Sequence, residues 1–457
     1  MATVGISFGS ATGGTGFDVT STVTSILAIQ QAIETPWQTQ LTALQAQDTA
    51  LSGIGTSLSS LTTDMTALTD PEGVMASKQG SSSDTNVLAL SSASSIAIAG
   101  SHTVTVTQLA QTSSEYSDQI TNATDTLSGS LTIQIGTGTA QTITLDSTDN
   151  TLQTLATALN SGSYGVTASV VSSATGSRLS LVSDNSGTAG QITLTPSLTD
   201  ATTSTSIGFT VGQTGQDAML NVDGLDTTSA SNTVTGAIPG VTFQLLATAP
   251  STPVQIQITN DNGSIETAVQ QMVTDYNSVI TGMATQEGNT SAGVAEPLYG
   301  SPTISLIQEQ LAGSLFSGAA SGSVNNIGQL GISVNDDGTL TLTVSTLDSI
   351  LNSNYADVQG YLQNSGSFGQ NLSTALNTLG TASPTGAISL ALAQNSTEES
   401  GLNTDITNEN ASIATQKTTL TTELNTANQV LQSIPQQLNE VNEIYDASTG
   451  YNEATTS

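Results

Sequence analysis

The sequence has no cysteine, one histidine and three basic residues among 457 residues. Without cysteine it offers no disulfide, no zinc–thiolate site and no thiol nucleophile, and His102 alone cannot supply a histidine-based triad. Lys78, Arg178 and Lys417 are too few to neutralise a nucleic-acid backbone. We therefore expect no nucleic-acid partner, no metal and no cofactor.

Aromatic residues make up 3% of the chain and charged residues 9%, and 36 acids give a net charge of −33. No segment approaches the roughly 18 to 20 apolar residues of a membrane span, and an anionic membrane surface would repel the chain. We expect no membrane partner. Residues 1–16 have neither the basic start nor the apolar core of a secretory signal peptide, which predicts export by another route.

Helical periodicity dominates the N-terminal part of the chain. Asp18 is a candidate N-cap, and Pro36 is expected to interrupt the helix that follows it. Beyond Pro36, apolar residues recur in two rows with a spacing of seven, which predicts a coiled-coil seam that ends at Asp70-Pro71. The seam residues are Leu44, Leu51, Ile54, Leu58, Leu61, Met65 and Leu68.

A second heptad pattern lies near the C-terminus. Its flanks are Thr, Asn, Gln and Glu, so ion pairs cannot select its partner, and Pro435 should kink or restart the helix. The seam residues proposed for assembly are Ile406, Ile413, Leu420, Leu424, Leu431, Leu438 and Val441. Two heptad segments so far apart in sequence suggest that the two ends of the chain come together.

The middle of the chain alternates apolar and polar residues, which is typical of half-buried strands. A short helix is expected near residues 151–159, helices at 265–283 and 345–362, and a hairpin at 330–344. The predicted class is α+β multidomain: terminal helical coiled-coil legs joined to a mixed helical domain, with β-rich head domains inserted in the middle.

The predicted boundaries follow these changes of period. They are 1–16 (disordered N-terminus), 17–45 (N-terminal leg helix), 46–80 and 264–380 (two parts of a helical leg domain), 81–115 and 216–263 (two parts of a β head domain), 116–215 (an inserted outer head domain), 381–445 (C-terminal coiled-coil leg) and 446–457 (disordered tail).

No catalytic pattern stands out. Asp336-Asp337-Gly338 and Asp261-Asn262-Gly263 lack the further ligands of a calcium loop, and turn formation explains both. Glu398 and Glu399 are adjacent on a helix and do not face each other, so a solvated face explains the pair. The sequence therefore predicts that the protein is not an enzyme.

Several segments, in order, resemble one family. Residues 16–23 (GFDVTSTV) and 102–114 (HTVTVTQLAQTSS) resemble the opening and the first head strand of flagellar hook-associated protein 2, the filament cap family. Residues 151–187 resemble a repeat of hook and flagellin-like proteins. Residues 217–245, with the Asp-Gly and Ile-Pro-Gly-Val motifs, and 327–342, with the Asp-Gly-x-Leu hairpin, complete the resemblance.

The resemblance implies a protein that forms a ring-like homo-oligomer at the distal tip of the bacterial flagellar filament and promotes insertion and polymerisation of flagellin. The implied partners are copies of itself, flagellin, hook-associated proteins and a cytoplasmic export chaperone. It implies secretion through the flagellar export channel, with adhesion as a secondary role. The family's flanking helices carry Lys and Arg, whereas this chain has three such residues in all.

Three other classes share some of these features. A flagellin-like or hook–filament junction protein also has helical termini around a β-rich middle, but the order of motifs favours the cap family. A secreted adhesin fits the Thr- and Ser-rich strands but not the paired heptads or the missing signal peptide. A carbohydrate-active enzyme would need aromatic platforms and a pair of catalytic carboxylates that the sequence does not show.

Overall fold

The computed structural model describes residues 16–380 and 384–449. Most of the predicted disordered N-terminus (1–16) and the end of the predicted tail (446–457) lie outside these residues, whereas residues 446–449 are helical. The chain divides into two compact units. One contains the residues up to Thr69 and from Val269 onward, and the other contains Asp70–Ala268.

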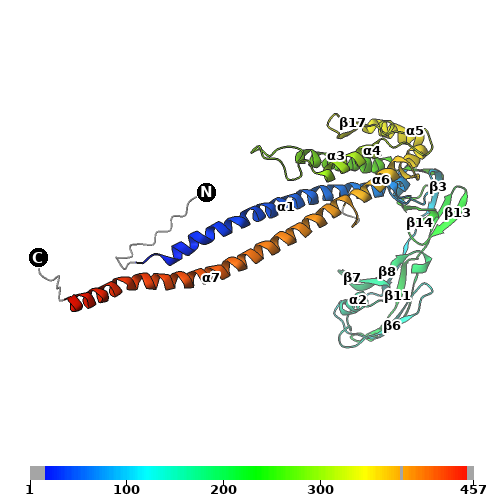
Figure 1. The fold of residues 1–457 in the computed structure, drawn as a ribbon. Coiled ribbons are helices and arrows are strands. Elements are labelled where there is room, and N and C mark those ends of the chain that lie inside the picture. The colour runs from blue at the N-terminus through cyan, green and yellow to red at the C-terminus, as the bar shows by residue number, and fades with distance from the viewer. Residues whose placement is uncertain (1–15, 381–383, 450–457) are drawn as a thin grey trace. The chain divides into compact units, whose positions relative to one another are not determined.

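The first unit is mainly helical, and its two longest helices lie side by side (Figure 1). The α-helix that ends the β-rich segment, α3, continues into it, and a small hairpin follows a 3₁₀ turn. Its elements are α1 (Val19–Thr69), α3 (Asn262–Gln286), α4 (Pro302–Leu315), η3 (Ile327–Leu330), β17 (Ile332–Val334), β18 (Leu340–Leu342), α5 (Val344–Gln363), α6 (Phe368–Leu379) and α7 (Ala387–Thr449).

The expected N-cap of the first helix is confirmed, but the expected break at Pro36 is wrong. The Ser21 backbone N–H donates to Asp18 Oδ1 over 3.1 Å. Helix α1 runs through Pro36 and α7 runs through Pro435. A proline removes one hydrogen bond from a helix, but its fixed φ is helical. In helices of 51 and 63 residues, the bonds on either side keep the backbone continuous.

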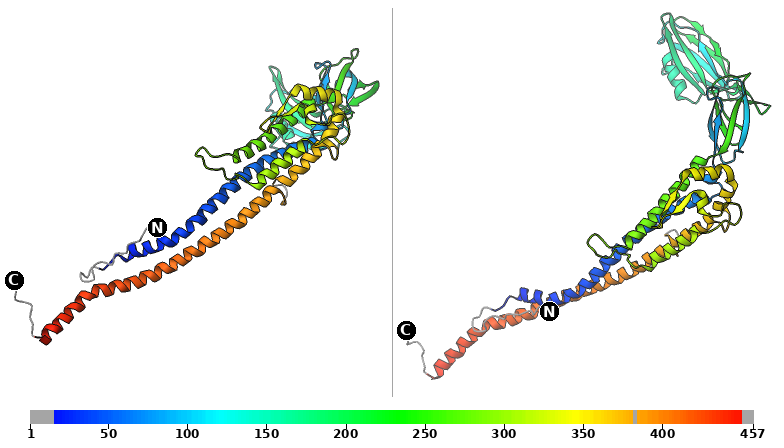
Figure 2. Two further views of the ribbon diagram at one scale, coloured as in Figure 1. Left: turned by 45° about the horizontal axis from the view of Figure 1, so that its top comes forward. Right: turned by 90° about the horizontal axis from the view of Figure 1, so that it is seen from above.

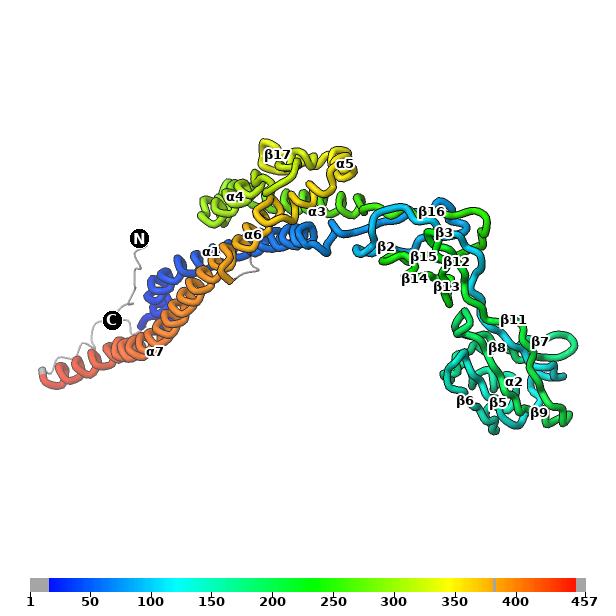
Figure 3. The backbone as a smooth tube through the Cα atoms, turned by 90° about the vertical axis from the view of Figure 1, so that its right-hand side faces the viewer, coloured from blue at the N-terminus to red at the C-terminus, as the bar shows by residue number. Residues whose placement is uncertain are grey.

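The second unit contains two β-rich parts (Figure 3). The first part has a five-stranded sheet in the order β1-β16-β3-β12-β13 and a three-stranded sheet β14-β15-β2. Inward side chains of both sheets, among them Val104, Phe243 and Ile256, form one core. The strands are β1 (Lys78–Ser82), β2 (Leu88–Ala93), β3 (Gly100–Gln108), β12 (Ala218–Val222), β13 (Leu225–Ser229), β14 (Thr233–Ile238), β15 (Val241–Leu245) and β16 (Val254–Asn260).

The second part is inserted between β3 and β12 of the first. Two four-stranded antiparallel sheets, β10-β9-β5-β6 and β11-β4-β8-β7, enclose a core with helix α2 (Figures 2 and 3). The elements are β4 (Thr112–Ser117), β5 (Leu127–Ile135), β6 (Gln141–Thr144), α2 (Leu152–Ser161), β7 (Val166–Ser173), β8 (Gly176–Ser186), β9 (Ile192–Asp200), β10 (Thr205–Ile207) and β11 (Phe209–Gln213).

These observations confirm the predicted class. Helices at both ends of the chain enclose a β-rich middle, and the short helix near residue 151, the two longer helices and the 330–344 hairpin form where the periodicity placed them. Helix α2 begins with a capping box, in which the Thr154 backbone N–H donates to Thr151 Oγ1 over 3.1 Å. Thus local sequence signals were sufficient for element type across most of the described chain.

Removal of a central core side chain should destabilise the β-rich unit. Leu179 of β8 is fully buried, so we expect Leu179→Ala to cost about 2 to 5 kcal/mol of unfolding free energy through lost burial and a residual cavity. Urea denaturation followed by circular dichroism measures this cost. Ser169→Ala, on the exposed face of the same sheet, should stay within about 0.5 kcal/mol, and an equal effect at both positions would contradict the assigned core.

Candidate assembly interface

The first and last helices pair in antiparallel fashion (Figures 1 and 2). Near the start of α1, the Phe17 backbone N–H donates to Asn428 Oδ1 over 2.9 Å. Farther along, Asn395 Nδ2 donates to Asp48 Oδ1 over 2.7 Å, and Gln40 donates to Glu398. Later residues of α1 contact earlier residues of α7, so the two helices run in opposite directions along one another.

An apolar cluster holds the outer part of this pair together. Val23 and Leu27 of α1 are 2% and 4% exposed, and they pack with Ile413 of α7. Leu420 and Leu424 pack against the same cluster and remain half-buried. The cluster is small, so the outer pair rests on few apolar contacts and on the amide hydrogen bonds described above.

The predicted N-terminal seam is buried against several helices of its own unit. Its seven residues are at most 7% exposed. Ile54 lies against Gly282 of α3, Leu58 lies beside Gly380, and the carbonyl of Leu68 accepts a hydrogen bond from Gln363 Nε2 of α5. This part of α1 therefore belongs to a multi-helix core, and its sequence repeat alone did not indicate that.

The predicted C-terminal seam becomes more exposed toward the end of α7. Ile413 is buried, whereas Ile406, Leu420, Leu424 and Leu431 are half-buried and Leu438 and Val441 are 46% and 61% exposed. Because Phe17 meets Asn428, α7 continues about 30 Å beyond the start of α1. We call the part of α7 from Val430 to Thr449 the overhang; its apolar row has no counterpart on α1.

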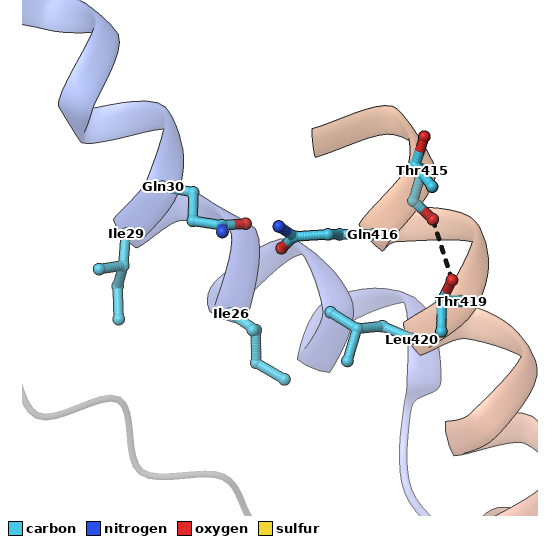
Figure 4. A pocket seen from close by; sticks show the side chains of 7 residues that line it. All are labelled: Ile26, Ile29, Gln30, Thr415, Gln416, Thr419 and Leu420. Atoms are coloured by element: carbon cyan, nitrogen blue, oxygen red, sulfur yellow. Dashed lines mark hydrogen bonds between the residues drawn. The ribbon is translucent and has the colours of Figure 1, made fainter. Parts of the chain in front are cut away.

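A groove with an apolar lining lies between the two helices (Figure 4). Ile26, Ile29 and Leu420 line it, and the amide groups of Gln30 and Gln416 point toward one another across it. Ile29 is 64% exposed although it is apolar. Such a lining suits an apolar side chain of a partner helix.

Two acceptor atoms near this groove have no hydrogen-bond partner among the described residues. They are Oε1 of Gln30 and Oε1 of Glu34, one helical turn apart on α1. Glu34 is only 6% exposed, and its second oxygen accepts a long bond of 3.4 Å from Gln38 Nε2. Buried acceptors are costly when unpaired, so a partner that donates hydrogen bonds here would gain affinity.

Electrostatic strain is concentrated at one carboxyl pair. Asp64 of α1 and Asp275 of α3 interact, and burial of Asp64 followed by the Asp275 hydrogen bond and charge raises the pKa of Asp64 to about 6. Asp64 Oδ2 is buried without a further partner. In the β-rich unit, His102 Nδ1 lies 2.7 Å from Asp223 Oδ2, and this contact lowers the pKa of Asp223.

The described residues contain no group of three or more His, Cys, Asp or Glu side chains that could hold a metal ion. Within the same residues, no helix is both long and apolar enough to cross a membrane. The contacts seen along the paired helices are apolar packing and hydrogen bonds from amide groups, such as those of Asn395 to Asp48 and of Gln40 to Glu398. A protein with paired terminal helices, inserted β-rich parts and this surface chemistry belongs to a structural, assembly-forming class.

Comparison with known proteins narrows this class. Residues 215–451 match the family model described as flagellar hook-associated protein 2 C-terminus, and residues 15–113 match the corresponding N-terminus. Residues 130–185 match the flagellin hook IN motif, which overlaps the repeat noticed at 151–187. The chain belongs to the flagellar hook-associated protein 2 family.

Individual relatives agree with this assignment. The chain is 29% identical over 398 residues to the flagellar hook-associated protein 2 of Escherichia coli K12, covering 80% of this chain and 84% of that protein. It is 28% identical over 316 residues to the B-type protein of Pseudomonas aeruginosa, covering 63% and 66%. The crystal structure of the D1-D2-D3 domains of the flagellar cap protein FliD from E. coli matches with a TM-score of 0.62, 26% identity and coverage of 76% and 99%.

Sequence reasoning located the two terminal helices that carry the predicted seams but missed the acid pair. Asp64 and Asp275 each sit beside an apolar residue of their helix, Met65 and Tyr276, and nothing in the local pattern places the two helices together. The contact depends on how α3 packs on α1 after the long β-rich excursion. No short-range signal reports such a pairing.

The acid pair predicts a pH-dependent stability of the helical unit. A folded-state pKa of about 6 lies above the ordinary value of 3.8, so the folded unit binds the Asp64 proton more tightly than the unfolded chain does. This contribution to stability is fully present below pH 3.8 and is lost as the pH rises through 6. We expect Asp64→Asn to flatten this part of the pH profile and to raise the melting temperature at pH 7.

Thermal melts between pH 4 and 8 measure this effect, with Glu423→Gln on the exposed surface of α7 as a control that should leave the profile unchanged. If the melting temperature of the wild type fell between pH 4 and 6 no more than that of Asp64→Asn does, the raised pKa of Asp64 would be contradicted.

The outer helix pair should open when its apolar cluster is trimmed. Leu27→Ala removes a side chain that is 4% exposed, and we expect a loss of about 2 kcal/mol, which corresponds to roughly thirtyfold faster amide exchange in residues 19–35. Hydrogen exchange read by mass spectrometry gives the rate. Ile33→Ala, at a position on the same helix that is 51% exposed, should change it little; equal acceleration by both variants would argue against pairing through this cluster.

Proposed function

We propose that this protein caps the distal tip of the bacterial flagellar filament as a homo-oligomer and promotes the insertion and polymerisation of flagellin. The observation that carries the proposal is the apolar row on the overhang of a paired leg, which α1 does not reach and where Leu438 and Val441 are exposed. Family membership and the likeness to the cap protein structure of E. coli support it.

The segments predicted as legs, 17–45 and 381–445, supply the contacts with the filament in this proposal. Exposure of an apolar row to water is unfavourable. Burying it against helices of another polypeptide contributes about 25 cal/mol of binding free energy per Å² of apolar surface. The groove between Ile26, Ile29 and Leu420 offers a second place for such contacts. Because the outer pair is held by a small cluster, its helices can adjust as the neighbouring subunits change.

The remaining expectations belong to the same proposal. Hook-associated proteins and a cytoplasmic export chaperone are the other partners, and export proceeds through the flagellar channel to the extracellular tip. The protein acts through binding and not through catalysis. The shortage of basic residues makes apolar and amide contacts, in place of ion pairs, the means by which this member recognises those partners.

Deletion of the gene tests the proposal directly. We expect cells without filaments that release unpolymerised flagellin into the medium, and restoration of filaments when the purified protein is added outside the cells. Electron microscopy and an immunoassay of the medium provide the two measurements. Filaments of normal length in the deletion strain would overturn the capping role and favour the adhesin.

The overhang provides a residue-level test of the same role. Leu438→Asp with Val441→Asp places charges on its apolar row, and we expect loss of filament restoration by at least about tenfold because those side chains can no longer be buried. Val294→Asp, at an exposed apolar position outside residues 17–45 and 381–445, is the control and should restore filaments normally. Full activity of the double variant would contradict the contribution of the overhang.

A further inference from the structure

The single arginine of the chain lies on the exposed face of a head sheet. Arg178 is in β8, where its neighbours Leu179 and Leu181 point into the core and Arg178, Ser180 and Val182 lie on the opposite face. In its sheet, β8 lies between β4 and β7, and Figure 3 labels β8 and β7 in the outer β-rich part. The register places Val171 of β7 directly beside Arg178.

Two contacts hold the arginine in place. Its guanidinium carbon lies 5.5 Å from the centre of the Tyr116 ring, and Nη1 donates to the carbonyl oxygen of Ser117 over 2.8 Å. Both partners belong to β4, the strand that pairs with β8. A guanidinium has five N–H donors, so this single bond leaves most of them available. The side chain is thus ordered without being neutralised.

The absence of an ion pair at Arg178 is informative because acids are abundant. The chain has 36 Asp and Glu residues, yet within residues 16–380 and 384–449 no Lys or Arg forms a salt bridge with any of them. Asp118, the acid next to Ser117, accepts instead from the Gly208 backbone N–H over 2.8 Å. Within the described residues, Arg178 therefore has no ion-pair partner although Asp118 follows the residue that it contacts.

Two large side chains lie beside this guanidinium on the same face. Tyr116 of β4, which the guanidinium covers, is 37% exposed, and Val171, directly across the register on β7, is 58% exposed. We call Arg178, Tyr116 and Val171 the Arg178 patch. Tyrosine and arginine are enriched among the residues that dominate protein–protein binding energy.

We propose that the Arg178 patch is a docking surface for a carboxylate-bearing face of a second copy of this chain. Charge complementarity identifies the occupant: each copy carries a net charge of −33 and offers many exposed acids, and the patch presents a fixed, unpaired cation. Copies that repel one another overall need local attraction at their contacts. The proposal rests on the homo-oligomer proposed above and locates one of its contacts in the head.

Self-association of the full chain tests the patch. We expect Arg178→Gln to weaken the oligomer by at least about tenfold in dissociation constant, measured by sedimentation velocity over a concentration series. Lys417→Gln makes the same change in net charge on the exposed surface of α7 and should leave the constant within about threefold. Val171→Glu should also weaken it, and because that side chain is exposed, this variant guards against a folding defect at Arg178.

The lack of native cysteine allows a second, direct measurement. Val171→Cys can be labelled with a maleimide photo-cross-linker at a single position, and mass spectrometry then identifies what lies against the patch. Cross-links to an acidic surface segment of a second copy support the proposal. An oligomer that is unchanged in Arg178→Gln and yields no intermolecular cross-link overturns it and leaves the oligomeric cap intact, whereas a wild-type chain that stays monomeric overturns both.

Discussion

The antiparallel pairing of α1 with α7 is the constraint on which the helical unit depends. It joins residues separated by almost the whole chain, as in the hydrogen bond from Phe17 to Asn428. The chain between the two helices therefore leaves the helical pair and returns to it. The inner part of α1 is then covered by further helices, whereas among the described residues the outer part of α1 packs against α7. Helix α1 is therefore part of a core near its C-terminal end, whereas near its N-terminal end apolar side chains such as Ile29 remain exposed.

How far the sequence predicts this arrangement depends on the range of the signal. Period seven identified both terminal helices, and period two identified the strands, because each reports on one face of a local element. The cap at Asp18 was readable because it acts over three residues, and the same range applies to the Thr151 cap, which the sequence analysis did not single out. The proline at position 36 misled, since local preference is outweighed in a long helix. The Asp64–Asp275 pair and the Arg178 patch were not predictable, because both need elements that only the tertiary fold brings together.

The unusual composition changes how the surface is stabilised. Threonine hydroxyls along both long helices donate to the carbonyl four residues earlier, as Thr39 does to Thr35 and Thr415 does to Ala411. These bonds satisfy the hydroxyls locally and replace the Glu–Lys pairs usual on exposed helices. They carry no preference for a partner. In the proposed function, recognition along the legs would therefore rest on apolar side chains and on a few amides.

That division has a consequence for an assembly made of identical acidic chains. A contact made of apolar rows and amides does not require charges to be aligned. Such a contact would let a leg bind successive neighbours of similar shape with similar affinity. A contact based on one ordered guanidinium is the opposite: it is directional and fails when the carboxylate is misplaced. With a single arginine in the chain, only one such contact per copy is available. In the proposed assembly, this contact would set how the heads of two copies associate, whereas contacts of the legs would depend on shape alone.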